Sequence, residues 1–289
     1  MKQIQWFPGH MPKTLRELAT EVKLCDAVIE IVDARAPFSS RNPEIQNIIG
    51  DKAHIILMNK ALLADSKETY KWSRIFHGQL KKVLEVDAIK DKNMILIKNT
   101  VKTEVNRINY IKGTRTINQT IRAMIVGIPN VGKSTLINNL ARKKSCATGN
   151  MPGLTRDTVW IKASEDFYLY DTPGVLWPKF DNETMAMHLA LIGSIDDDIL
   201  PLDDVCGYGF AFVDKYYRRL FKEYYKLADY DINDLETIYA QIAKSRGCYL
   251  KQEIDYERIN RLFLKDLRSK KLGGITFDRA DDHTQKKVI

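Results

Sequence analysis

Arg122-Ala-Met-Ile-Val-Gly-Ile-Pro-Asn-Val-Gly-Lys-Ser134 is the stretch that decides the fold. A short apolar run ends in a glycine-rich loop with the spacing Gly127-x-x-x-x-Gly-Lys-Ser134, and helical spacing continues from Lys133 to Lys143. Strand, glycine loop and helix in this order are typical of a phosphate site, because loop N–H groups and the positive end of the helix dipole attract phosphate. A chance glycine-rich turn is the weaker interpretation. The stretch therefore predicts an α/β domain that binds a nucleoside triphosphate.

The residues at the end of this loop have predictable tasks. Lys133 reaches the β and γ phosphates, and the Ser134 hydroxyl is a ligand for Mg²⁺. Asp171-Thr-Pro-Gly174 follows a later strand, where such enzymes place a metal-binding Asp and a glycine amide near the γ-phosphate. Thr155, in Pro152-Gly-Leu-Thr155, offers a hydroxyl to the same ion, although a plain surface turn would look alike.

The chain before the loop has a β–α–β rhythm. Short β-branched runs predict strands at Ala27–Asp33, His54–Asn59 and Lys82–Val86, with helices at Pro43–Ile49 and Ser66–Gln79. Asn99–Thr120 is expected to be helix followed by linker, and Thr158–Ala163 with Asp166–Asp171 a pair of strands. This rhythm is typical of a parallel sheet covered by helices.

A base-reading pair lies upstream of the phosphate motifs. GTPases read guanine with an Asn-Lys-x-Asp loop that normally comes after the phosphate loops, yet here Asn59-Lys60 comes before them. Cutting such a domain after the Asp171 loop and joining its old ends would restore the usual order, with Asp87 and Ala88 in a further nucleotide-binding loop. We therefore expect a P-loop GTPase fold with circularly permuted motifs.

Composition limits the partners. Apolar residues make up 44% and charged residues 28% of 289 residues, and the four cysteines form no Cys-x-x-Cys pair for zinc. No apolar run approaches the roughly 20 residues that span a bilayer, and the start lacks a signal-peptide core. We expect a cytoplasmic protein without a membrane partner. The net charge of +8 indicates a polyanionic partner, and its excess lies in the first 195 residues, with 28 basic against 19 acidic side chains.

Beyond Trp177 the pattern becomes helical, with Gly274–Phe277 as a strand candidate. We expect a GTPase domain over residues 1–177 and a helical RNA-binding domain over residues 178–289. One amphipathic helix of the second domain carries a basic stripe opposite an apolar side. Its members are Arg258, Arg261, Lys265 and Arg268. The stripe could lie along RNA phosphates, and a merely solvated charged face is an equal alternative.

The motifs together carry a resemblance to one family. They are Trp6-Phe-Pro-Gly-His10, Asp33-Ala-Arg-Ala-Pro37, Asn59-Lys60, Gly127–Thr135, Pro152–Thr155, Asp171–Gly174, Lys244–Cys248 and Ile254-Asp-Tyr256. The chain resembles the ribosome biogenesis GTPase A family, also called YlqF, over nearly its whole length. The resemblance implies a bacterial cytoplasmic GTPase, monomeric off the ribosome, that binds GTP, GDP and Mg²⁺ and assists assembly of the large ribosomal subunit on its rRNA.

The resemblance also assigns roles within the loops. Val175 and Leu176 stand where Ras-like enzymes carry a water-orienting glutamine, and the family resemblance suggests His10 for that task. A structural histidine is the alternative. Asn130 resembles an asparagine that holds K⁺ in GTPases without an arginine finger, with loop capping as the alternative. The nucleotide-binding set implied by the loop is Asn130, Val131, Gly132, Lys133, Ser134, Thr135 and Gly174.

One departure concerns the base. Leu62 stands where the family's base-reading loop carries Asp, so the carboxylate that accepts hydrogen bonds from guanine is missing. Asp65 could turn inward, but helix capping or solvation is the stronger interpretation. Two alternatives to a GTPase stay open: a P-loop ATPase with relaxed base specificity, and a non-enzymatic RNA scaffold with structural nucleotide.

Overall fold

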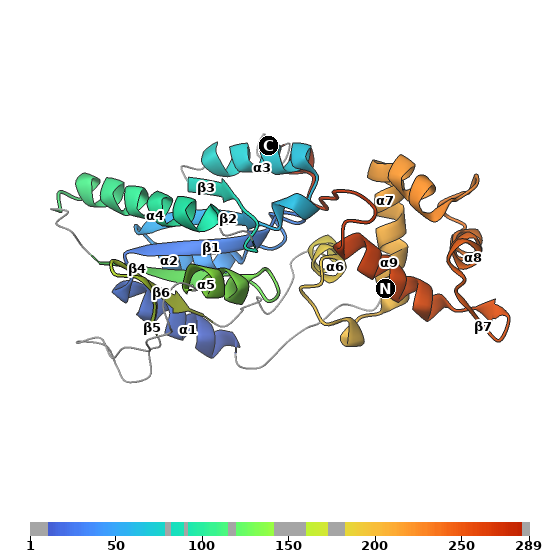
Figure 1. Ribbon diagram of the computed structural model, residues 1–289, viewed down its shortest axis with the longest axis horizontal. Coiled ribbons are helices and arrows are strands. Elements are labelled where there is room, and N and C mark those ends of the chain that lie inside the picture. The colour runs from blue at the N-terminus through green and yellow to red at the C-terminus, as the bar shows by residue number, and fades with distance from the viewer. Residues whose placement is uncertain are drawn as a thin grey trace.

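Two lobes make up the computed structural model, which describes residues 11–78, 82–89, 92–114, 120–141, 160–172 and 183–284 (Figure 1). We call the described residues up to 172 the sheet lobe and residues 183–273 the helical lobe. The strands of the sheet lobe are β1 (Ala27–Asp33), β2 (Ala53–Asn59), β3 (Lys82–Glu85), β4 (Ile121–Val126), β5 (Trp160–Ser164) and β6 (Phe167–Asp171). Its helices are α1 (Met11–Glu21), η1 (Val22–Leu24), α2 (Pro43–Ile49), η2 (Ala61–Leu63), α3 (Ser66–Gly78), α4 (Lys92–Ile111) and α5 (Lys133–Ala141).

The strand order confirms the permuted fold. The sheet runs β3-β2-β1-β4-β6-β5, and neighbouring strands are parallel except for β5, which is antiparallel to β6. From β1 the sheet extends through β2 to β3 on one side. From β4 it extends through β6 to β5 on the other side. Ligands of such sheets bind beyond the carboxyl ends of the strands where the direction reverses. Asp33, Asn59, Gly127 and Asp171 all lie at or just after these ends.

Helices cover both faces of the sheet. α4 and α5 pack on one face, against Ile29, Ile55 and Ile125. α1, α2 and α3 cover the other face, where Val28 and Met58 point. All seven residues of β1 are buried, as expected for a central parallel strand with helices on both faces of its sheet. This rigid layer holds the strand ends, and with them the site, in place.

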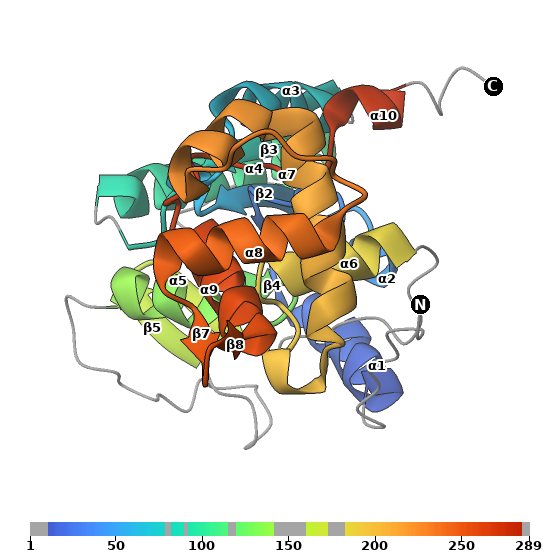
Figure 2. The same cartoon turned by 90° about the vertical axis from the view of Figure 1, so that its right-hand side faces the viewer.

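The helical lobe is built around aromatic side chains. Its elements are α6 (Glu183–Leu191), η3 (Asp197–Ile199), α7 (Leu202–Tyr225), α8 (Leu235–Arg246), β7 (Tyr249–Leu250), β8 (Glu253–Ile254) and α9 (Tyr256–Arg268). Phe210 lies 4.5 Å from Phe263 and 5.6 Å from Phe221, measured between ring centroids. α7, α8 and α9 therefore pack on one another around these rings, and Figure 2 shows α8 and α9 side by side in front of the sheet.

Residues 274–284, which we call the C-terminal strap, leave the helical lobe and return to the sheet lobe. The strap ends in α10 (Ala280–Thr284), which packs beside α3 (Figure 2). The backbone N–H groups of Ile275 and Phe277 donate to the carbonyls of Leu63 and Arg35, at 3.3 and 2.7 Å. A strand was predicted at Gly274–Phe277, and that prediction is wrong: the segment is extended, but its partners are loop carbonyls rather than a neighbouring strand.

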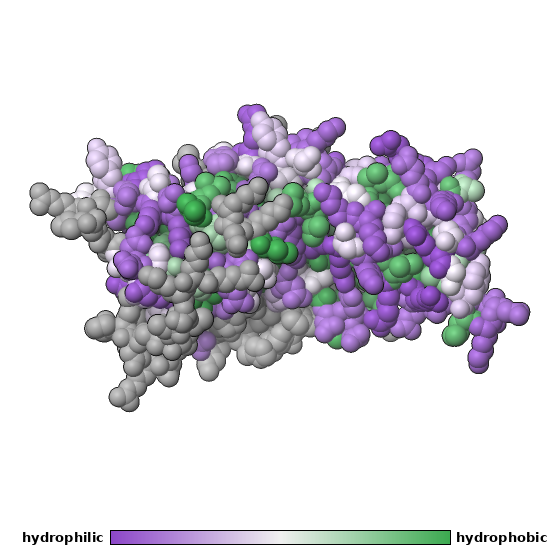
Figure 3. All heavy atoms as spheres, viewed as in Figure 1, coloured by the Kyte–Doolittle hydropathy of each residue, from purple (hydrophilic) through white to green (hydrophobic). Residues whose placement is uncertain are grey.

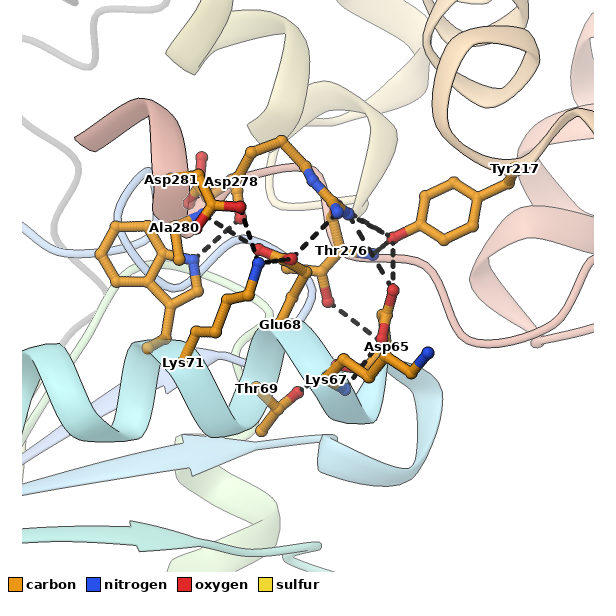
Figure 4. A network of polar contacts seen from close by, with 12 residues as sticks. Asp65, Lys67, Glu68, Thr69, Lys71, Tyr217, Thr276, Asp278, Ala280 and Asp281 are labelled. Atoms are coloured by element: carbon orange, nitrogen blue, oxygen red, sulfur yellow. Dashed lines mark hydrogen bonds and ion pairs between the residues drawn. The ribbon is translucent and has the colours of Figure 1, made fainter. Parts of the chain in front are cut away.

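Polar side chains fasten the strap beside the start of α3 (Figure 4). Asp65 receives hydrogen bonds from the Lys67 N–H (2.9 Å) and the Tyr217 hydroxyl (3.1 Å), and its own N–H donates to the Thr276 hydroxyl. Tyr217 lies at a kink in α7, where its backbone is non-helical. Glu68 accepts hydrogen bonds from the Arg279 guanidinium and the Ala280 N–H, both at 2.9 Å. Three segments thus meet in one network.

Asp278 forms the buried end of the strap. Its carboxylate accepts hydrogen bonds from the N–H groups of Phe38 and Ser39 (both 2.7 Å), and it lies 2.8 Å from Nδ1 of His188 on α6. Burial alone would raise the pKa of this carboxyl, but His188 and Ser39 outweigh burial and lower the pKa. The Asp278 carboxylate thus joins the loop after β1 to the helical lobe.

The predicted helices and strands of the sheet lobe match the structure closely, since α2, β1 and the strand before the glycine loop agree within a residue. α4 begins at Lys92, earlier than expected, and the short β7–β8 hairpin was not predicted. Within the described ranges, every helix falls short of the length and apolar character that a bilayer span requires. On the face shown in Figure 3, hydrophilic side chains dominate and apolar ones form small separate patches.

Candidate nucleotide site

The glycine-rich loop joins β4 to α5 at the carboxyl edge of the sheet. Gly132 has φ +106°, and a Cβ atom there would collide with the Asn59 side-chain amide. Glycine is therefore required both by the backbone conformation and by the close approach of Asn59. The Lys133 ammonium donates to the carbonyls of Gly127 and Ile128 at 3.1 and 3.0 Å, inside the loop. Burial lowers the pKa of Lys133 to about 8, against the opposing attraction of Asp171.

Asn59 bridges two loops that are far apart in sequence. Its Nδ2 donates to the Val131 carbonyl at 2.7 Å, and its Oδ1 accepts from the Ala88 N–H at 2.8 Å. Asn59 is 3% exposed, so both partners would be costly to leave unpaired. This side chain therefore fixes the phosphate loop relative to the Asp87-Ala88 loop. The motifs that sequence order separates are brought together here.

Lys60 supports the same arrangement. Its backbone is left-handed (φ +58°), which turns the chain sharply into η2. Its ammonium donates to the Asn130 carbonyl at 2.7 Å and lies 3.0 Å from the buried Asp33 carboxylate, which also binds Arg35 in a two-pronged contact. Burial would raise the pKa of Asp33, but Arg35 and Lys60 outweigh burial and lower the pKa to about 2. The lysine is thus held by a permanent negative charge.

A cavity of about 330 Å³ opens beside this bridge. Six predicted nucleotide-binding residues line it: Asn59, Lys60, Asp87 and Ala88, with Gly132 and Thr135 of the phosphate loop and the start of α5. Its other lining residues include Arg35, Leu63, Ile192 and Arg268. Sequence reasoning did not place these four at the nucleotide site. The Asp33-Ala-Arg-Ala-Pro37 motif was the available signal for Arg35, whereas nothing local indicated that Ile192 and Arg268 of the helical lobe reach this cavity.

The position of Leu62 removes it from this cavity. Leu62 lies in η2, is 47% exposed and is absent from the cavity lining. Asp65 does not replace the missing carboxylate, because Oδ1 caps the start of α3 through the Lys67 N–H and Oδ2 accepts from Tyr217. The capping interpretation of Asp65 is therefore confirmed, and the base-side carboxylate must come from elsewhere if there is one.

The phosphate end of the site offers oxygen ligands. Ser134 lies in the first turn of α5 and is exposed, and Asp171 is the last residue of β6, where it pairs in register with Ile125 of β4. Burial raises the pKa of Asp171, and Lys133 opposes that rise. A hydroxyl and a carboxylate are ligands that Mg²⁺ accepts, so the donor chemistry fits this ion. Among the described residues, His, Cys, Asp and Glu side chains form no group of three that could hold a metal. His10, Thr155 and Gly174 lie outside the described residues.

Asn130 makes a contact that links the lobes. It has φ +61°, and its Nδ2 donates to the Gly193 carbonyl, after α6, at 2.9 Å. The Asn130 amide nitrogen thus forms a hydrogen bond between the two lobes. The K⁺ role expected of Asn130 would use the amide oxygen, so it stays a prediction.

The basic residues of α9 do not share one face. Arg258, Arg261 and Lys265 are exposed and line a hollow of about 580 Å³ beside Arg246. Arg268 departs from the predicted stripe, because its guanidinium donates to the carbonyls of Ala190 and Leu191 and pairs with Asp197 at 2.7 Å. Arg268 therefore caps the end of α6 and is not available as part of an RNA-binding stripe.

A phosphate loop after β4, an Asn-Lys pair that bridges to it from β2, and a permuted strand order define a P-loop GTPase with circularly permuted motifs. Comparisons with known proteins agree. Residues 122–235 match the family described as "50S ribosome-binding GTPase". The chain is 43% identical over 284 residues to Ribosome biogenesis GTPase A of Bacillus cereus, covering 96% of this chain and 95% of that protein. It is 42% identical over 287 residues to the protein of that name from Priestia megaterium, with 98% and 99% covered.

A solved structure, GDP-bound TM YlqF, superposes with a TM-score of 0.68 at 25% identity, covering 92% of this chain and all of that one. The chain belongs to the ribosome biogenesis GTPase A family. It is accordingly a GTPase of ribosome assembly.

Proposed function

We propose that this GTPase acts on the precursor of the large ribosomal subunit and contacts its rRNA. The observation that supports nucleotide binding is the Asn59 bridge, which joins a base-side loop to a phosphate loop across one cavity. The ribosomal half is supported by the description of the matching family and by the names of the relatives. We place this activity in the cytoplasm, and the protein acts as a monomer off the ribosome.

We assign the nucleotide contacts as follows. Asn59, Lys60, Asp87 and Ala88 surround the base; Asn130, Val131, Gly132, Lys133, Ser134, Thr135 and Gly174 surround the phosphates. Ser134, Thr155 and Asp171 would hold Mg²⁺, which offsets phosphate charge when bound. Asn130 would hold K⁺, and His10 would orient the attacking water. The loops of Thr155 and Gly174 would respond to the γ-phosphate and so act as a switch.

We assign RNA contact to α9. Arg258, Arg261 and Lys265 project from one exposed side of the helix, and cations spaced along a helix can follow the phosphates of structured RNA. We divide the chain into a GTPase domain of residues 1–177 and an RNA-binding domain of residues 178–289. The C-terminal strap belongs to the second domain by sequence and packs against the first.

The test is GTP turnover with and without purified large-subunit precursors. We expect the particles to stimulate turnover, and turnover to be faster in K⁺ buffers than in Na⁺ buffers. Lys133→Ala should abolish both effects, since the Lys133 ammonium lies within the phosphate loop. Mature small subunits serve as the control particle. Unchanged turnover with precursors, or full in-cell assembly activity of a Lys133→Ala, Ser134→Ala variant, would contradict the proposal and favour a nucleotide-bound RNA scaffold.

A P-loop ATPase with relaxed base specificity is the second candidate. One observation favours it: the position that normally supplies the base-reading carboxylate carries Leu62, which does not line the cavity. Competition of GTP and ATP for the wild-type protein separates the two. Equal affinity for both nucleotides would favour the second candidate.

A further inference from the structure

Asp87 stands out at the base side of the cavity. Among the described residues that line this cavity, Asp87 carries the only carboxylate, whereas the cationic side chains there are Arg35, Lys60 and Arg268. Leu62, at the position from which a carboxylate would be expected, is outside the lining. An acidic side chain is therefore present at the cavity, supplied from a different loop.

Backbone contacts place Asp87 next to the turn that carries Leu62. The Ala61 N–H donates to the Val86 carbonyl at 3.2 Å, and the Ala88 N–H donates to the Asn59 Oδ1 at 2.8 Å. Asp87 thus sits between two residues that are both bonded to the Asn59–Ala61 turn. Its Oδ1 accepts a 3.3 Å hydrogen bond from the Ile89 N–H, which holds the carboxylate within its own loop. The loop cannot move away from the turn without breaking these bonds.

Guanine and adenine differ at the edge that a carboxylate would meet. Guanine presents a ring N–H and an amino group, both donors, whereas adenine presents a ring nitrogen with a lone pair at the equivalent place. A carboxylate accepts hydrogen bonds from the first edge and repels the second. We propose that Asp87 reads the guanine edge in this protein and so replaces the carboxylate lost at Leu62. The inference rests on the proposed base site and specifies which residue selects the base.

The experiment compares diphosphate affinities by calorimetry for the wild type and for Asp87→Asn. We expect wild type to bind GDP more tightly than inosine diphosphate, which lacks the amino group, and far more tightly than ADP. In Asp87→Asn, GDP binding should weaken about 10- to 100-fold, because the hydrogen bonds to a charged acceptor are removed. Xanthosine diphosphate should bind more tightly to Asp87→Asn than to wild type. The asparagine amide can donate a hydrogen bond to the oxygen that replaces the guanine amino group in xanthine.

Two further variants make the test specific. Asp51→Asn removes an exposed carboxylate that pairs with Lys112 and should leave all affinities unchanged. Adding Leu62→Asp to Asp87→Asn should leave GDP binding weak, because position 62 lies outside the cavity lining. A structural role for Asp87 would instead lower GDP and xanthosine diphosphate affinity together.

Distinct outcomes would overturn the inference or the site itself. Unchanged GDP affinity in Asp87→Asn, or a parallel loss of all diphosphates, would refute the role of Asp87. If the wild type bound GDP and ADP with equal affinity and Lys133→Ala abolished the binding of both, the role of Asp87 would also be refuted. The phosphate site would still be supported by that result. Failure of the wild type to bind any diphosphate would refute both the site and the inference.

Discussion

Single side chains fix the geometry of the nucleotide site, and Asn59 is the clearest of them. Its amide group pairs with one carbonyl and one N–H from loops on either side of the cavity. Because Gly132 leaves room for this approach, the phosphate loop and the base-side loop behave as one rigid unit. Substitutions here should therefore affect both stability and nucleotide affinity.

Asn59→Ala should lower the free energy of unfolding by about 2–6 kcal/mol, because two buried backbone groups lose their partners at roughly 1–3 kcal/mol each. GDP affinity should fall at least about tenfold, because the nucleotide-bound state also bears the free-energy cost of an unpaired backbone group. Chemical denaturation and calorimetry measure the two effects. Asn47→Ala, on the exposed side of α2, is the matched control, and equal behaviour of both variants would contradict the bridging role.

Lys133 predicts a dependence of affinity on pH. Burial lowers the pKa of its ammonium to about 8 in the free protein, and a bound triphosphate would raise that pKa because it favours the charged form. Binding then takes up a proton above pH 8, so affinity should fall as pH rises from about 8 to 9.5. Below pH 8 the lysine is charged in both states and affinity should be flat.

Lys133→Arg is the control for this prediction, because arginine stays protonated throughout the range. Any titration of the nucleotide itself affects both proteins equally. Fluorescence titrations at half-unit pH steps measure the difference between them. Parallel curves for lysine and arginine would show that the Lys133 ammonium does not control the pH dependence.

At the scale of elements, the C-terminal strap shows how an irregular segment can hold two lobes together. Before α10 the strap is extended without pairing to a strand, and it instead bonds to Leu63, Arg35 and α3. Asp278 is its buried anchor, at 2% exposure, between the Phe38-Ser39 backbone and His188. The contact of the strap with the loop after β1 and with α6 therefore depends on this carboxylate remaining ionised.

Asp278→Asn should destabilise the protein by roughly 2–4 kcal/mol at neutral pH, because an amide cannot accept all of the hydrogen bonds made by the carboxylate. The lowered pKa of Asp278 means that its stabilisation is complete above the unfolded-state pKa of about 4. The stabilisation is lost as pH falls through the lower folded-state pKa. The difference between wild type and variant should therefore shrink below about pH 4 in urea unfolding.

Asp281→Asn tests whether any carboxylate in the strap stabilises the protein as much as Asp278 does. Asp281 lies in α10 and pairs with Lys71, but its side chain is 72% exposed, and exposed ion pairs contribute about 0–1 kcal/mol. The variant should therefore differ from wild type by less than about 1 kcal/mol at every pH. A loss as large as that of Asp278→Asn would argue against burial as the cause.

The sequence predicted elements with strong local signals and missed those that depend on distant partners. β1 and α2 match their predicted bounds because apolar periodicity and a proline at the first helical position are local properties. The path of Gly274–Phe277 depends on carbonyls of Leu63 and Arg35, which lie far away in the sequence, so no local pattern could reveal it. Likewise, helical spacing grouped Arg268 with Arg261, but the carbonyl end of α6 decides where Arg268 points.

At the scale of the whole molecule, the nucleotide cavity lies where the two lobes meet. Ile192 and Arg268 of the helical lobe line the same cavity as Asn59 and Asp87, and Asn130 of the phosphate loop bonds to Gly193. A ligand in this cavity would therefore touch both lobes. The arrangement gives the helical lobe a direct physical connection to occupancy of the cavity.

Binding to large-subunit precursors should depend strongly on salt. Each cation that neutralises an RNA phosphate releases counterions, and removing one such cation changes the slope of log affinity against log salt by about 1. Replacing Arg258, Arg261 and Lys265 with glutamine should therefore reduce the slope by about 3. Filter binding at several salt concentrations measures the slope. The same change at Arg218, Arg219 and Lys222 of α7 is the control, and equal reductions would show that α9 is not the contact surface.

The position of the strap after the helical lobe in the chain has a consequence for synthesis. Chains fold from the N-terminus as they are made, so β1, β2 and β3 appear before β4, which completes the pairing of β1 in the finished sheet. The helical lobe follows, and residues 274–284, which fasten it to α3, are translated after that lobe. A nascent molecule therefore completes its sheet before the strap is available to fasten the helical lobe to α3. Premature termination before Gly274 would release a GTPase whose helical lobe lacks this attachment to α3.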